Sequence, residues 1–304
     1  MDKIKQIIKP SDIDIVIYHH PCVDGYSAAF IAFKCLAIYS KKKTTLMPKG
    51  FNSSPTNLEL VKDKNVLMVD IVTSDFQEIK SVAKNLIILD HHKTNQAALK
   101  DIPYAYFDMH KSGVGLAWEY FTYDEKIPLF LECIQDRDLW TWTIADSRNF
   151  CDGLYELIDL NDKTFKLLND LWNYRLPKFK EVYDFGEKLN EIKQKKLEMI
   201  AKEDRNKYEV TVDEKKYNVY IYNQIGNIVS DLGNHVVEKF DCDFVIIWNY
   251  NHDDEIYRYS LRSKDSKTDV SEICKFFGGG GHRNAAGMGS DKHPKELFLY
   301  KKIE

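Results

Sequence analysis

The sequence predicts an α/β protein with an N-terminal parallel sheet and flanking helices, a long connecting helix and a smaller C-terminal α+β domain. Three observations support this fold class. Short apolar runs alternate with helically spaced segments in the first half, as in parallel sheets whose strands are joined by helices. A highly charged stretch with apolar residues at helical intervals follows, and several strands then lie close together along the chain. We therefore expect a first domain over 1–177, a connecting helix over 178–206 and a second domain over 207–304.

The first domain contains the alternating strands and helices. Apolar runs predict strands over 13–18, 44–47, 66–69, 87–89 and 104–107. Helical patterns cover 25–39, 75–84 and 112–123, and another helix is expected to begin at Pro128, because proline suits a first helical turn.

The connecting helix is indicated by apolar residues that recur at helical intervals between charged ones, namely Val182, Phe185, Leu189, Ile192, Leu197 and Ile200. Beyond it we expect strands over 208–212, 217–222, 244–248 and 256–262, with helices near 227–239 and 270–277. The small residues Ala285, Ala286 and Gly287 follow a run of glycines, and they suit the start of a further, closely packed helix.

Composition excludes several classes of protein. The 304 residues are 44% hydrophobic and 30% charged, which is enough for a full core and argues against global disorder. A net charge of −4 creates no overall basic field, and it suits a short anionic substrate better than a long duplex. No 18-residue apolar run and no signal-peptide core occur, so no membrane association is expected. Six scattered cysteines without a C-x-x-C pair indicate a reducing compartment, the cytoplasm.

Three predicted strands end on residues that bind metals. The strand over 87–89 runs into Asp90-His91-His92, and the strand over 66–69 ends on Asp70. The strand over 13–18 continues into the segment 19–25, which contains two histidines, a cysteine and an aspartate. Ligands of open α/β sheets bind beyond the carboxyl ends of the strands. We therefore expect a site there for Mn²⁺, Fe²⁺, Zn²⁺ or Mg²⁺, which Asp and His side chains ligate.

The inventory is large enough for two ions. The candidates are His20, Asp24, Asp70, Asp90, His91, His92 and the Asp136/Asp138 pair. Two divalent ions lower the pKa of a shared water and clamp phosphoryl oxygens, which is the chemistry of phosphoester hydrolysis. Taken singly, Asp70 or Asp90 could equally be a helix N-cap.

Two neighbouring pairs require a choice of ligand. Strand alternation sends His19 and His20 to opposite faces, and we interpret His19 as the packing residue. Residues two apart do not share a helix face, so Asp136 and Asp138 cannot both be ligands. We favour Asp136 as the ligand and assign Asp138 to the surrounding shell or a salt bridge.

The second strong signal is the glycine run at 278–281, which continues through His282 and Arg283 to Gly287. Glycine backbones can point their N–H groups at an anion without interference from a Cβ atom. Backbone groups of Gly279, Gly280 and Gly281, with the side chains of His282 and Arg283, are therefore candidate phosphate contacts. Arg262 at a strand end is a further candidate, although a solvated surface arginine fits equally well. A flexible linker is the alternative for the glycine run itself.

These motifs together resemble a known family. Asp90-His91-His92 is similar to the motif that names the DHH phosphoesterases, and residues 278–287 look like the signature of the DHH-associated C-terminal domain. The segment His20-x-Cys22-x-Asp24-Gly25 resembles the family's first motif, Asp70 its second and Asp136 its fourth. The motifs occur in the family's order between residues 15 and 287.

The resemblance implies a DHH catalytic domain over 1–177 that binds two divalent ions and a DHH-associated substrate-binding domain over 207–304. The implied metal ligands are His20, Cys22, Asp24, Asp70, His91 and Asp136, with Asp70 bridging both ions. The implied catalytic residues are Asp90, His91 and His92, of which Asp90 and His92 support the site. The implied substrate-binding residues are Arg262, Gly279, Gly280, Gly281, His282 and Arg283. Mn²⁺ is the expected ion, with Mg²⁺, Fe²⁺ and Zn²⁺ left open.

Cys22 departs from the family pattern, which usually has an aspartate at this position. A thiolate is a softer ligand than a carboxylate, and it suits Zn²⁺ or Fe²⁺ better than Mg²⁺. Some members that act on short oligonucleotides have a similar His-x-x-Cys-x-Asp-Gly pattern, and in that register His19 rather than His20 is the ligand.

The expected activity is metal-dependent hydrolysis of short oligonucleotides, or of linear or cyclic dinucleotides, to nucleoside monophosphates by a two-metal activated water. A single-strand DNA exonuclease of the same superfamily ranks lower, because such enzymes commonly need a strand-binding module and basic channels. A non-catalytic scaffold that lost a metal site is the third alternative, supported only by Cys22. We expect a short RNA or dinucleotide as partner and no stable duplex, and a homodimer stays open. Tyr259 and Phe277 are candidate base-stacking residues.

Overall fold

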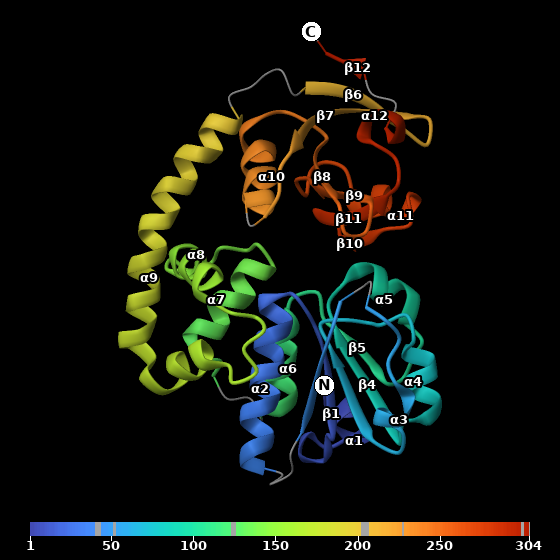
Figure 1. Ribbon diagram of the computed structural model, residues 1–304, viewed down its shortest axis with the longest axis vertical. Coiled ribbons are helices and arrows are strands. Elements are labelled where there is room, and N and C mark those ends of the chain that lie inside the picture. The colour runs from blue at the N-terminus through green and yellow to red at the C-terminus, as the bar shows by residue number, and fades with distance from the viewer. Residues whose placement is uncertain are drawn as a thin grey trace. The chain divides into compact units, whose positions relative to one another are not determined.

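The structure is a computed structural model that describes residues 1–39, 44–50, 53–122, 126–201, 207–226, 228–298 and 301–303. The chain forms two compact units, Met1–Asn190 and Glu191–Glu304, each built around one sheet (Figure 1). The α/β class expected from the sequence is confirmed, with a parallel sheet in the first unit and a mixed sheet in the second.

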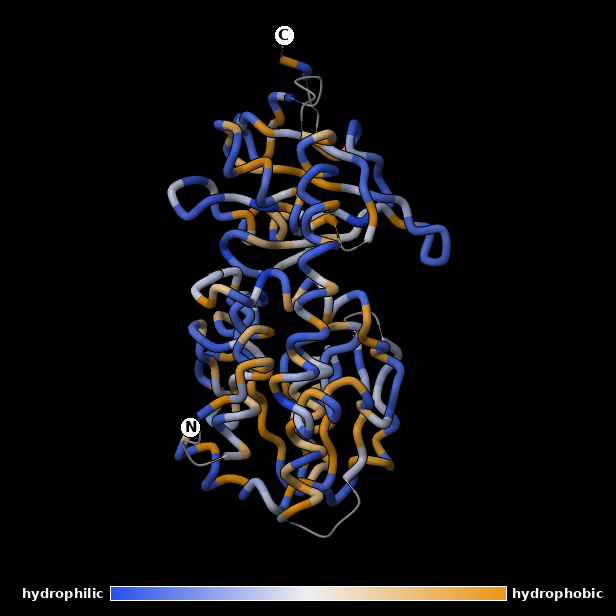
Figure 2. Tube along the Cα trace, turned by 90° about the vertical axis from the view of Figure 1, so that its left-hand side faces the viewer, coloured by the Kyte–Doolittle hydropathy of each residue, from blue (hydrophilic) through white to orange (hydrophobic). Residues whose placement is uncertain are grey.

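The sheet of the first unit has five parallel strands in the order β2-β1-β3-β4-β5. Their bounds are Ile15–His19 for β1, Thr45–Lys49 for β2, Asn65–Val69 for β3, Asn85–Asp90 for β4 and Ala105–Phe107 for β5. The central strand β3 is buried along its whole length, as expected for a parallel sheet covered on both faces. Figure 2 shows the apolar segments concentrated along the strands.

Helices cover both faces of this sheet directly or pack on the helices that do, and the last of them continues past Asn190 into the second unit. They are α1 (Asp2–Ile7), α2 (Val23–Tyr39), α3 (Leu58–Val61), α4 (Phe76–Val82), α5 (Lys93–Leu99), α6 (Gly113–Phe121), α7 (Leu129–Asp138), α8 (Ser147–Leu157) and α9 (Lys166–Ala201), with a 3₁₀ turn at Pro10–Asp12. Strand residues alternate between two cores. Leu67 and Leu89 pack with α2 and α6, whereas Val66 and Ile88 pack with α3 and α4.

The connecting helix expected over 178–206 is the second part of a longer helical segment, α9. The helical segment begins at Lys166, and residues 202–206 at its expected end lie outside the described residues. A break at Arg175, with φ 41 and ψ −112, divides α9 just before Pro177. Proline has no N–H to donate and clashes with the preceding turn, which explains the break. The helix expected at Pro128 starts one residue later, with Pro128 as its N-cap.

The second unit has a seven-stranded sheet in the order β10-β11-β9-β8-β7-β6-β12, in which only β7 and β8 pair in parallel. The strands are β6 (Lys207–Val212), β7 (Lys215–Asn223), β8 (Phe244–Asn251), β9 (Ile256–Arg262), β10 (Gly280–His282), β11 (Ala285–Ser290) and β12 (Lys301–Lys302). The helices are α10 (Ile228–Lys239), α11 (Val270–Phe276) and α12 (Pro294–Leu297). Helix α10 packs against Val245 and Ile247 of β8, and α11 packs with Phe244 and Ile246.

The prediction of a helix that starts at Ala285 is wrong, because Ala285–Ser290 forms strand β11. Ala286 and Met288 alternate into the core beside α11, which is the period of a strand. The small residues serve close packing: a Cβ atom at Gly279 would lie 2.3 Å from the Gly287 carbonyl oxygen.

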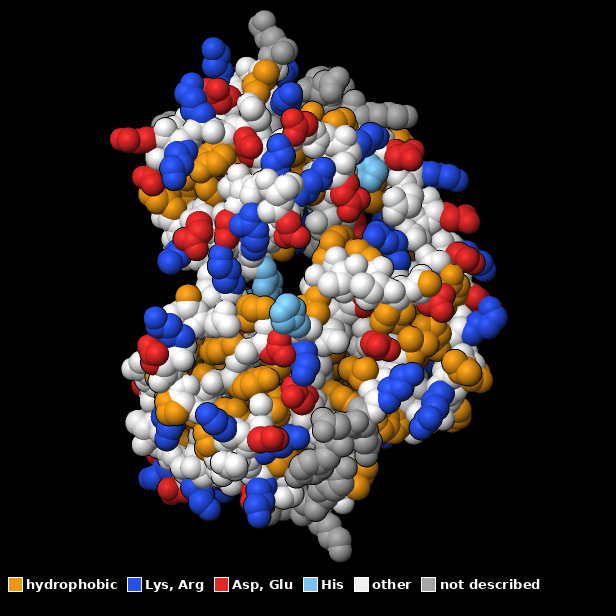
Figure 3. All heavy atoms as spheres, turned by 180° about the vertical axis from the view of Figure 1, so that it is seen from behind, with side chains coloured by type: hydrophobic (Ala, Val, Ile, Leu, Met, Phe, Trp, Pro, Cys, Tyr) orange, Lys and Arg blue, Asp and Glu red, His pale blue; other side chains and the backbone are white. Residues whose placement is uncertain are grey.

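The distribution of charged side chains and the apolar character of the helices are relevant to what the protein can bind. On the face shown in Figure 3, basic and acidic side chains are interspersed. Within the described residues, no helix combines the length and apolar character that crossing a membrane requires.

Candidate active site

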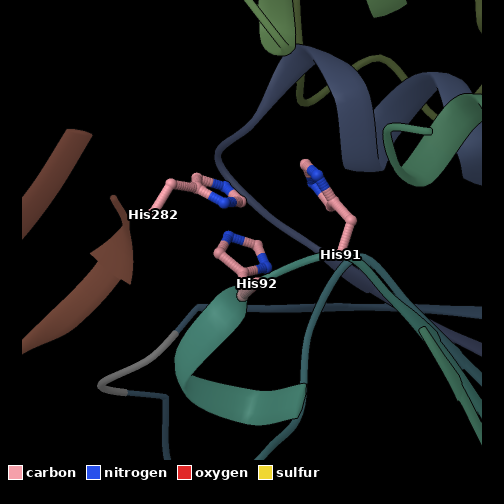
Figure 4. Close-up of side chains that lie close together, drawn as sticks. All are labelled: His91, His92 and His282. Atoms are coloured by element: carbon pink, nitrogen blue, oxygen red, sulfur yellow. The ribbon is translucent and has the colours of Figure 1, made fainter. Parts of the chain in front are cut away.

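Three neighbouring strands bring chemically active side chains to one edge of the first unit's sheet. His19 is the last residue of β1, Asp70 follows β3 directly, and Asp90 ends β4 before His91 and His92. Because β1, β3 and β4 are parallel neighbours, their carboxyl ends meet at the same edge. Figure 4 shows His91 and His92 extending from the chain that leaves β4.

The carboxylate of Asp70 lies at the centre of this edge. Its Oδ2 is 3.3 Å from His19 Nδ1, and its Oδ1 is 3.1 Å from His91 Nε2. Asp70 belongs to three groups of potential ligands whose atoms lie within 4.8 Å of one another: His19/Cys22/Asp70, Asp24/Asp70/His91 and Asp70/Asp90/His92. Asp70 also has a left-handed backbone with φ 61, a strained conformation that is common at functional sites. The carboxylate therefore has the position that a bridging ligand requires.

Asp24 is buried at the start of α2 and is held by the N-terminus of α6. Its Oδ1 accepts hydrogen bonds from Ser112 Oγ at 2.6 Å and from the Val114 N–H at 3.0 Å, and its Oδ2 accepts the Gly113 N–H at 2.5 Å. Oδ2 is also 4.0 Å from His91 Nε2. The N-terminus of a helix favours a negative charge, so α6 orients this carboxylate toward Asp70 and His91.

Two glycines make this crowding feasible. A Cβ atom at Gly113 would lie 2.4 Å from the Cβ of Asp70, and one at Gly25 would lie 2.3 Å from the carbonyl oxygen of His19. Any side chain at either position would push the helices away from the strand ends. Sequence reasoning missed Gly113 and Ser112 as site residues, although a Ser-Gly pair that opens a helix was the available signal.

The choice between the adjacent histidines is corrected. His19 contacts Asp70, whereas the ring of His20 packs edge-on against Tyr18 with centroids 6.4 Å apart and lines a separate cavity that includes Pro48. The alternation argument was right that the two side chains diverge. It did not tell which of the two lies beside Asp70, and the structure places His19 there, as the alternative register of the first motif expects.

The choice between the two aspartates of α7 is also corrected. Asp138 Oδ2 lies 3.4 Å from His91 Nε2. The carboxylate of Asp136 instead accepts hydrogen bonds from Thr141 Oγ1 at 2.7 Å, from the Thr143 N–H at 2.8 Å and from Ser147 Oγ. Asp136 therefore organises the loop after α7, and Asp138 is the residue that faces the other potential ligands.

Asp90 and His92 form a pair beside this group. Asp90 Oδ1 is 2.7 Å from His92 Nδ1 and accepts the His91 N–H at 2.9 Å, while Oδ2 accepts Asn95 Nδ2 at 2.6 Å. Burial would raise the pKa of Asp90, but His92 and its hydrogen bond hold it below its ordinary value. The carboxylate thereby fixes the orientation of His92.

We refer to His19, Cys22, Asp24, Asp70, His91 and Asp138 as the ligand cluster. Its electrostatics favour a bound cation. Burial would lower the pKa of His91, yet the hydrogen bond to Asp70 and the charges of Asp138, Asp70 and Asp24 raise it to about 10. Burial, followed by neighbouring carboxylates, raises the pKa of Asp24 and of Cys22. The excess of negative groups holds a proton on His91, and the same potential would hold a metal ion. Carboxylate, imidazole and thiolate donors suit a divalent transition metal.

The glycine run of the second unit has a structural explanation. Gly278 ends α11 in a left-handed conformation with φ 81, and its N–H donates to the Lys275 carbonyl at 3.0 Å. The Gly279 N–H donates to the Cys274 carbonyl at 2.8 Å, which completes a Schellman motif. Gly281, with φ 139, lies in strand β10. The predicted anion contacts of Gly279, Gly280, Gly281 and His282 in this hairpin stay predictions.

The two predicted arginine contacts have protein partners. Arg283 donates to the carbonyls of Asp265 at 2.7 Å and Lys267 at 2.9 Å, so it braces a loop. Arg262 donates to Ser230 Oγ at 2.8 Å beneath α10, and burial lowers its pKa to about 10. Both guanidinium groups thus contribute to the fold of this unit.

The suggested stacking residues are part of the second unit's core. Tyr259 is 2% exposed, and Phe277 packs against Phe298 with ring centroids 5.5 Å apart. Tyr259 therefore offers no open face for a base, whereas Phe277 is half-buried and its stacking role stays a prediction.

Comparisons with known proteins agree with this arrangement. Residues 14–137 match the DHH family, N-terminal domain. The chain is 36% identical over 300 residues to the uncharacterized protein R106 of Acanthamoeba polyphaga mimivirus, covering 93% of this chain and 68% of that protein. It is 26% identical over 234 residues to oligoribonuclease NrnB of Bacillus subtilis (strain 168), covering 70% of this chain and 54% of NrnB. The chain thus spans about half the length of NrnB.

A solved structure supports the fold. An exopolyphosphatase-related protein from Bacteroides fragilis superposes with a TM-score of 0.52 at 14% identity, covering 97% of this chain and 93% of that chain. At this identity the likeness concerns the fold alone.

The parallel sheet, the strand-end aspartates and the adjacent histidines define a class of enzyme, the phosphoesterases, which hydrolyse phosphate esters. The chain belongs to the DHH family. Two features of the structure agree with this family: the motif Asp90-His91-His92 at the end of β4, and the position of Asp70 between His19 and His91.

Proposed function

We propose that the protein is a metal-dependent phosphodiesterase that hydrolyses short oligonucleotides or linear or cyclic dinucleotides to nucleoside monophosphates. The observation that carries the proposal is the carboxylate of Asp70 between His19 and His91, with Asp24 and Asp138 beyond them. The similarity to oligoribonuclease NrnB supports a nucleotide substrate.

In this proposal, one divalent ion would be held by His19, Cys22 and Asp70, and the other would be held by Asp24, Asp70, His91 and Asp138. When bound, two such ions lower the pKa of a water and neutralise charge on the phosphoryl oxygens. Mn²⁺ is the proposed ion, and the thiol of Cys22 also admits Fe²⁺ or Zn²⁺.

His92 is the proposed proton donor to the leaving oxygen. Burial would lower its pKa, but the charge of Asp90 and the hydrogen bond to it raise that pKa above the ordinary histidine value, which favours the protonated form that a proton donor needs. Asp90 binds Nδ1 at 2.7 Å and thereby directs proton transfer to Nε2. Asp90 in turn needs Asn95, whose amide at 2.6 Å keeps its second oxygen in place.

The division of labour expected from the sequence is part of the proposal. A catalytic domain over 1–177 would carry the ligand cluster, and a domain over 207–304 would bind the substrate through Gly279, Gly280, Gly281 and His282. A short substrate is favoured because the net charge of −4 supplies no broad basic surface. The proposed compartment is the cytoplasm, because the six cysteines, all of them within the described residues, form no disulfide with one another.

Hydrolysis assays across substrate lengths test the proposal. We expect Mn²⁺-dependent release of mononucleotides from pApA and from a 5-mer, with slower turnover of a 40-mer single-stranded DNA. Asp70→Asn should abolish turnover, and Asp184→Asn, on the exposed surface of α9, is the matched control. Faster degradation of the 40-mer would favour a single-strand exonuclease. No hydrolysis of any nucleotide, together with no Mn²⁺ binding, would favour a non-catalytic scaffold.

A further inference from the structure

Helix α7 ends in an unusual turn immediately after the ligand Asp138. The Trp140 N–H donates to the Arg137 carbonyl at 3.0 Å, and the Thr141 N–H donates to the Asp136 carbonyl at 3.0 Å. This is a Schellman motif in which Trp140 has the left-handed conformation, with φ 58. Helix α11 ends with the same pattern of bonds, and there the left-handed residue is Gly278.

Glycine is the usual residue at this position, because a Cβ atom crowds the following carbonyl oxygen in a left-handed backbone. Trp142, two residues further on, is left-handed as well, with φ 51. The chain therefore keeps two bulky indoles at two strained positions. Strained backbone that persists in this way is concentrated at binding and active sites.

Hydrogen bonds to the carboxylate of Asp136 keep the backbone after α7 in this strained conformation. Its buried carboxylate accepts Thr141 Oγ1 at 2.7 Å, the Thr143 N–H at 2.8 Å, Thr143 Oγ1 at 2.9 Å and Ser147 Oγ. Charged acceptors make stronger hydrogen bonds than neutral ones. The loop from 139 to 147 is thus fixed around one carboxylate.

The indoles are supported by a buried cation. The guanidinium of Arg137 lies 4.4 Å from the ring centroid of Tyr155, 5.5 Å from that of Trp140 and 5.8 Å from that of Trp142. The two indoles meet edge to face, with centroids 4.9 Å apart, and Arg148 covers Trp142 at 4.2 Å. Both indoles are half-buried; Trp142 contacts the guanidinium groups of Arg137 and Arg148, and Trp140 contacts that of Arg137.

This stack adjoins the ligand cluster. Trp140 follows Asp138 by two residues, so their Cα atoms are at most about 7.6 Å apart. Asp138 itself is 3.4 Å from His91. Tyr155, whose ring contacts Arg137, is close enough to Cys22 and Asp138 to interact with both electrostatically. The backbone of Trp140 is therefore within one nucleotide's length of the position where the cluster would hold a phosphate.

We propose that Trp140 is the surface on which a nucleobase of the substrate stacks, with Arg137 and Trp142 as positioning residues that hold the indole in place. The inference rests on the proposed function and assigns its base-recognition site. Bases of every kind present a π-face to an indole, so recognition by stacking tolerates sequence variation.

Substitutions of Trp140, assayed on two substrates, test the inference. The substrates are pApA and a dinucleotide of the same backbone without bases. Trp140→Leu keeps an apolar side chain but removes the π-face, and it should raise the KM for pApA by about 5- to 150-fold, the range measured for loss of one base stack. The abasic substrate should be unaffected, and Trp140→Phe should restore most of the affinity for pApA.

Tyr174→Ala, which removes an aromatic side chain that is 64% exposed, is the control for loss of a surface ring and should change neither KM. An equal loss on both substrates, or no loss on either, would overturn the inference. Calorimetric titration of pApA separates this result from a failure of the proposed function. If the wild-type protein binds pApA without hydrolysing it, weaker binding by Trp140→Leu still supports stacking, whereas equal binding or no binding to either protein rejects it.

Discussion

The carboxylate of Asp70 lies 3.1 Å from Nε2 of His91, and this contact joins the ends of the neighbouring strands β3 and β4, although the two residues are 21 positions apart in the chain. The hydrogen bond and the surrounding carboxylates together raise the pKa of His91 to about 10. A proton on this nitrogen stands where a metal ion is proposed to bind. Predictions about metal binding, pH dependence and stability depend on that relationship.

The two aspartates of α7 should separate metal binding from stability. Asp138→Asn is expected to cost more than the about 10- to 100-fold in metal affinity that loss of an outer-shell partner costs. Asp136→Asn should instead lower the free energy of unfolding by about 2 kcal/mol, because a charged acceptor of several buried hydrogen bonds is lost. Metal titration and urea unfolding of both variants measure the two effects. If Asp136→Asn lost metal and Asp138→Asn did not, Asp136 would be the ligand, as expected from the sequence.

The adjacent histidines should differ in the same way. His19→Gln removes the imidazole that contacts Asp70 at 3.3 Å, so we expect fewer ions per chain and a loss of turnover. His20→Gln changes a ring that packs on Tyr18, and it should leave the metal stoichiometry near that of the wild type. Elemental analysis of both purified variants provides the measurement. The reverse result would mean that the first motif uses the other register.

Cys22 should give the bound metal a spectroscopic signature. Its sulfur lies within 4.8 Å of the ligand atoms of His19 and Asp70. A Co²⁺-substituted protein is therefore expected to show a thiolate-to-cobalt charge-transfer band, which Cys22→Ser should remove. Cys22→Asp should shift the metal preference toward Mn²⁺ and Mg²⁺, because a carboxylate is the harder ligand. A spectrum that is the same with and without the thiol would exclude Cys22 from the coordination shell.

The metal-free protein should lose stability as the pH rises. The pKa of His91 is raised from 6.5 to about 10 in the folded state, so its protonated form stabilises the fold. That contribution is complete below the unfolded pKa of 6.5 and is lost as the pH rises through about 10. In EDTA, the difference in unfolding free energy between the wild type and His91→Gln should shrink over this range. A difference that stays constant with pH would contradict the assignment.

At Trp140, a substitution that makes the protein more stable is expected to weaken substrate binding. Trp140→Gly and Trp140→Ala remove the same indole, but only glycine relieves the left-handed strain. The glycine variant is therefore expected to be more stable than the alanine variant by about 1 kcal/mol. Both should bind pApA equally weakly. Urea unfolding and calorimetric binding test the pair, and equal stabilities would show that the backbone is not strained there.

By itself, the sequence determined which segments of the first unit form parallel strands, and it placed the candidate ligands at the ends of those strands. Apolar runs that end on Asp70, Asp90 and the segment after residue 18 were sufficient to predict parallel strands with ligands at their carboxyl ends, because this pattern depends on local periodicity. The helix expected at Ala285 failed for a related reason. Small residues suit both close-packed helices and close-packed strands, and the neighbours that decide between them lie elsewhere in the chain.

Only the tertiary structure decided which member of each neighbouring pair faces the ligand cluster. His19 and His20, like Asp136 and Asp138, have the same chemistry and differ only in direction. That direction depends on which face of β1 adjoins Asp70 and on how α7 is rotated against the strand ends. The role of Trp140 was equally out of reach, since its importance comes from a backbone angle and from Arg137 behind it. Orientation is set by packing between distant segments, and a linear pattern carries no record of it.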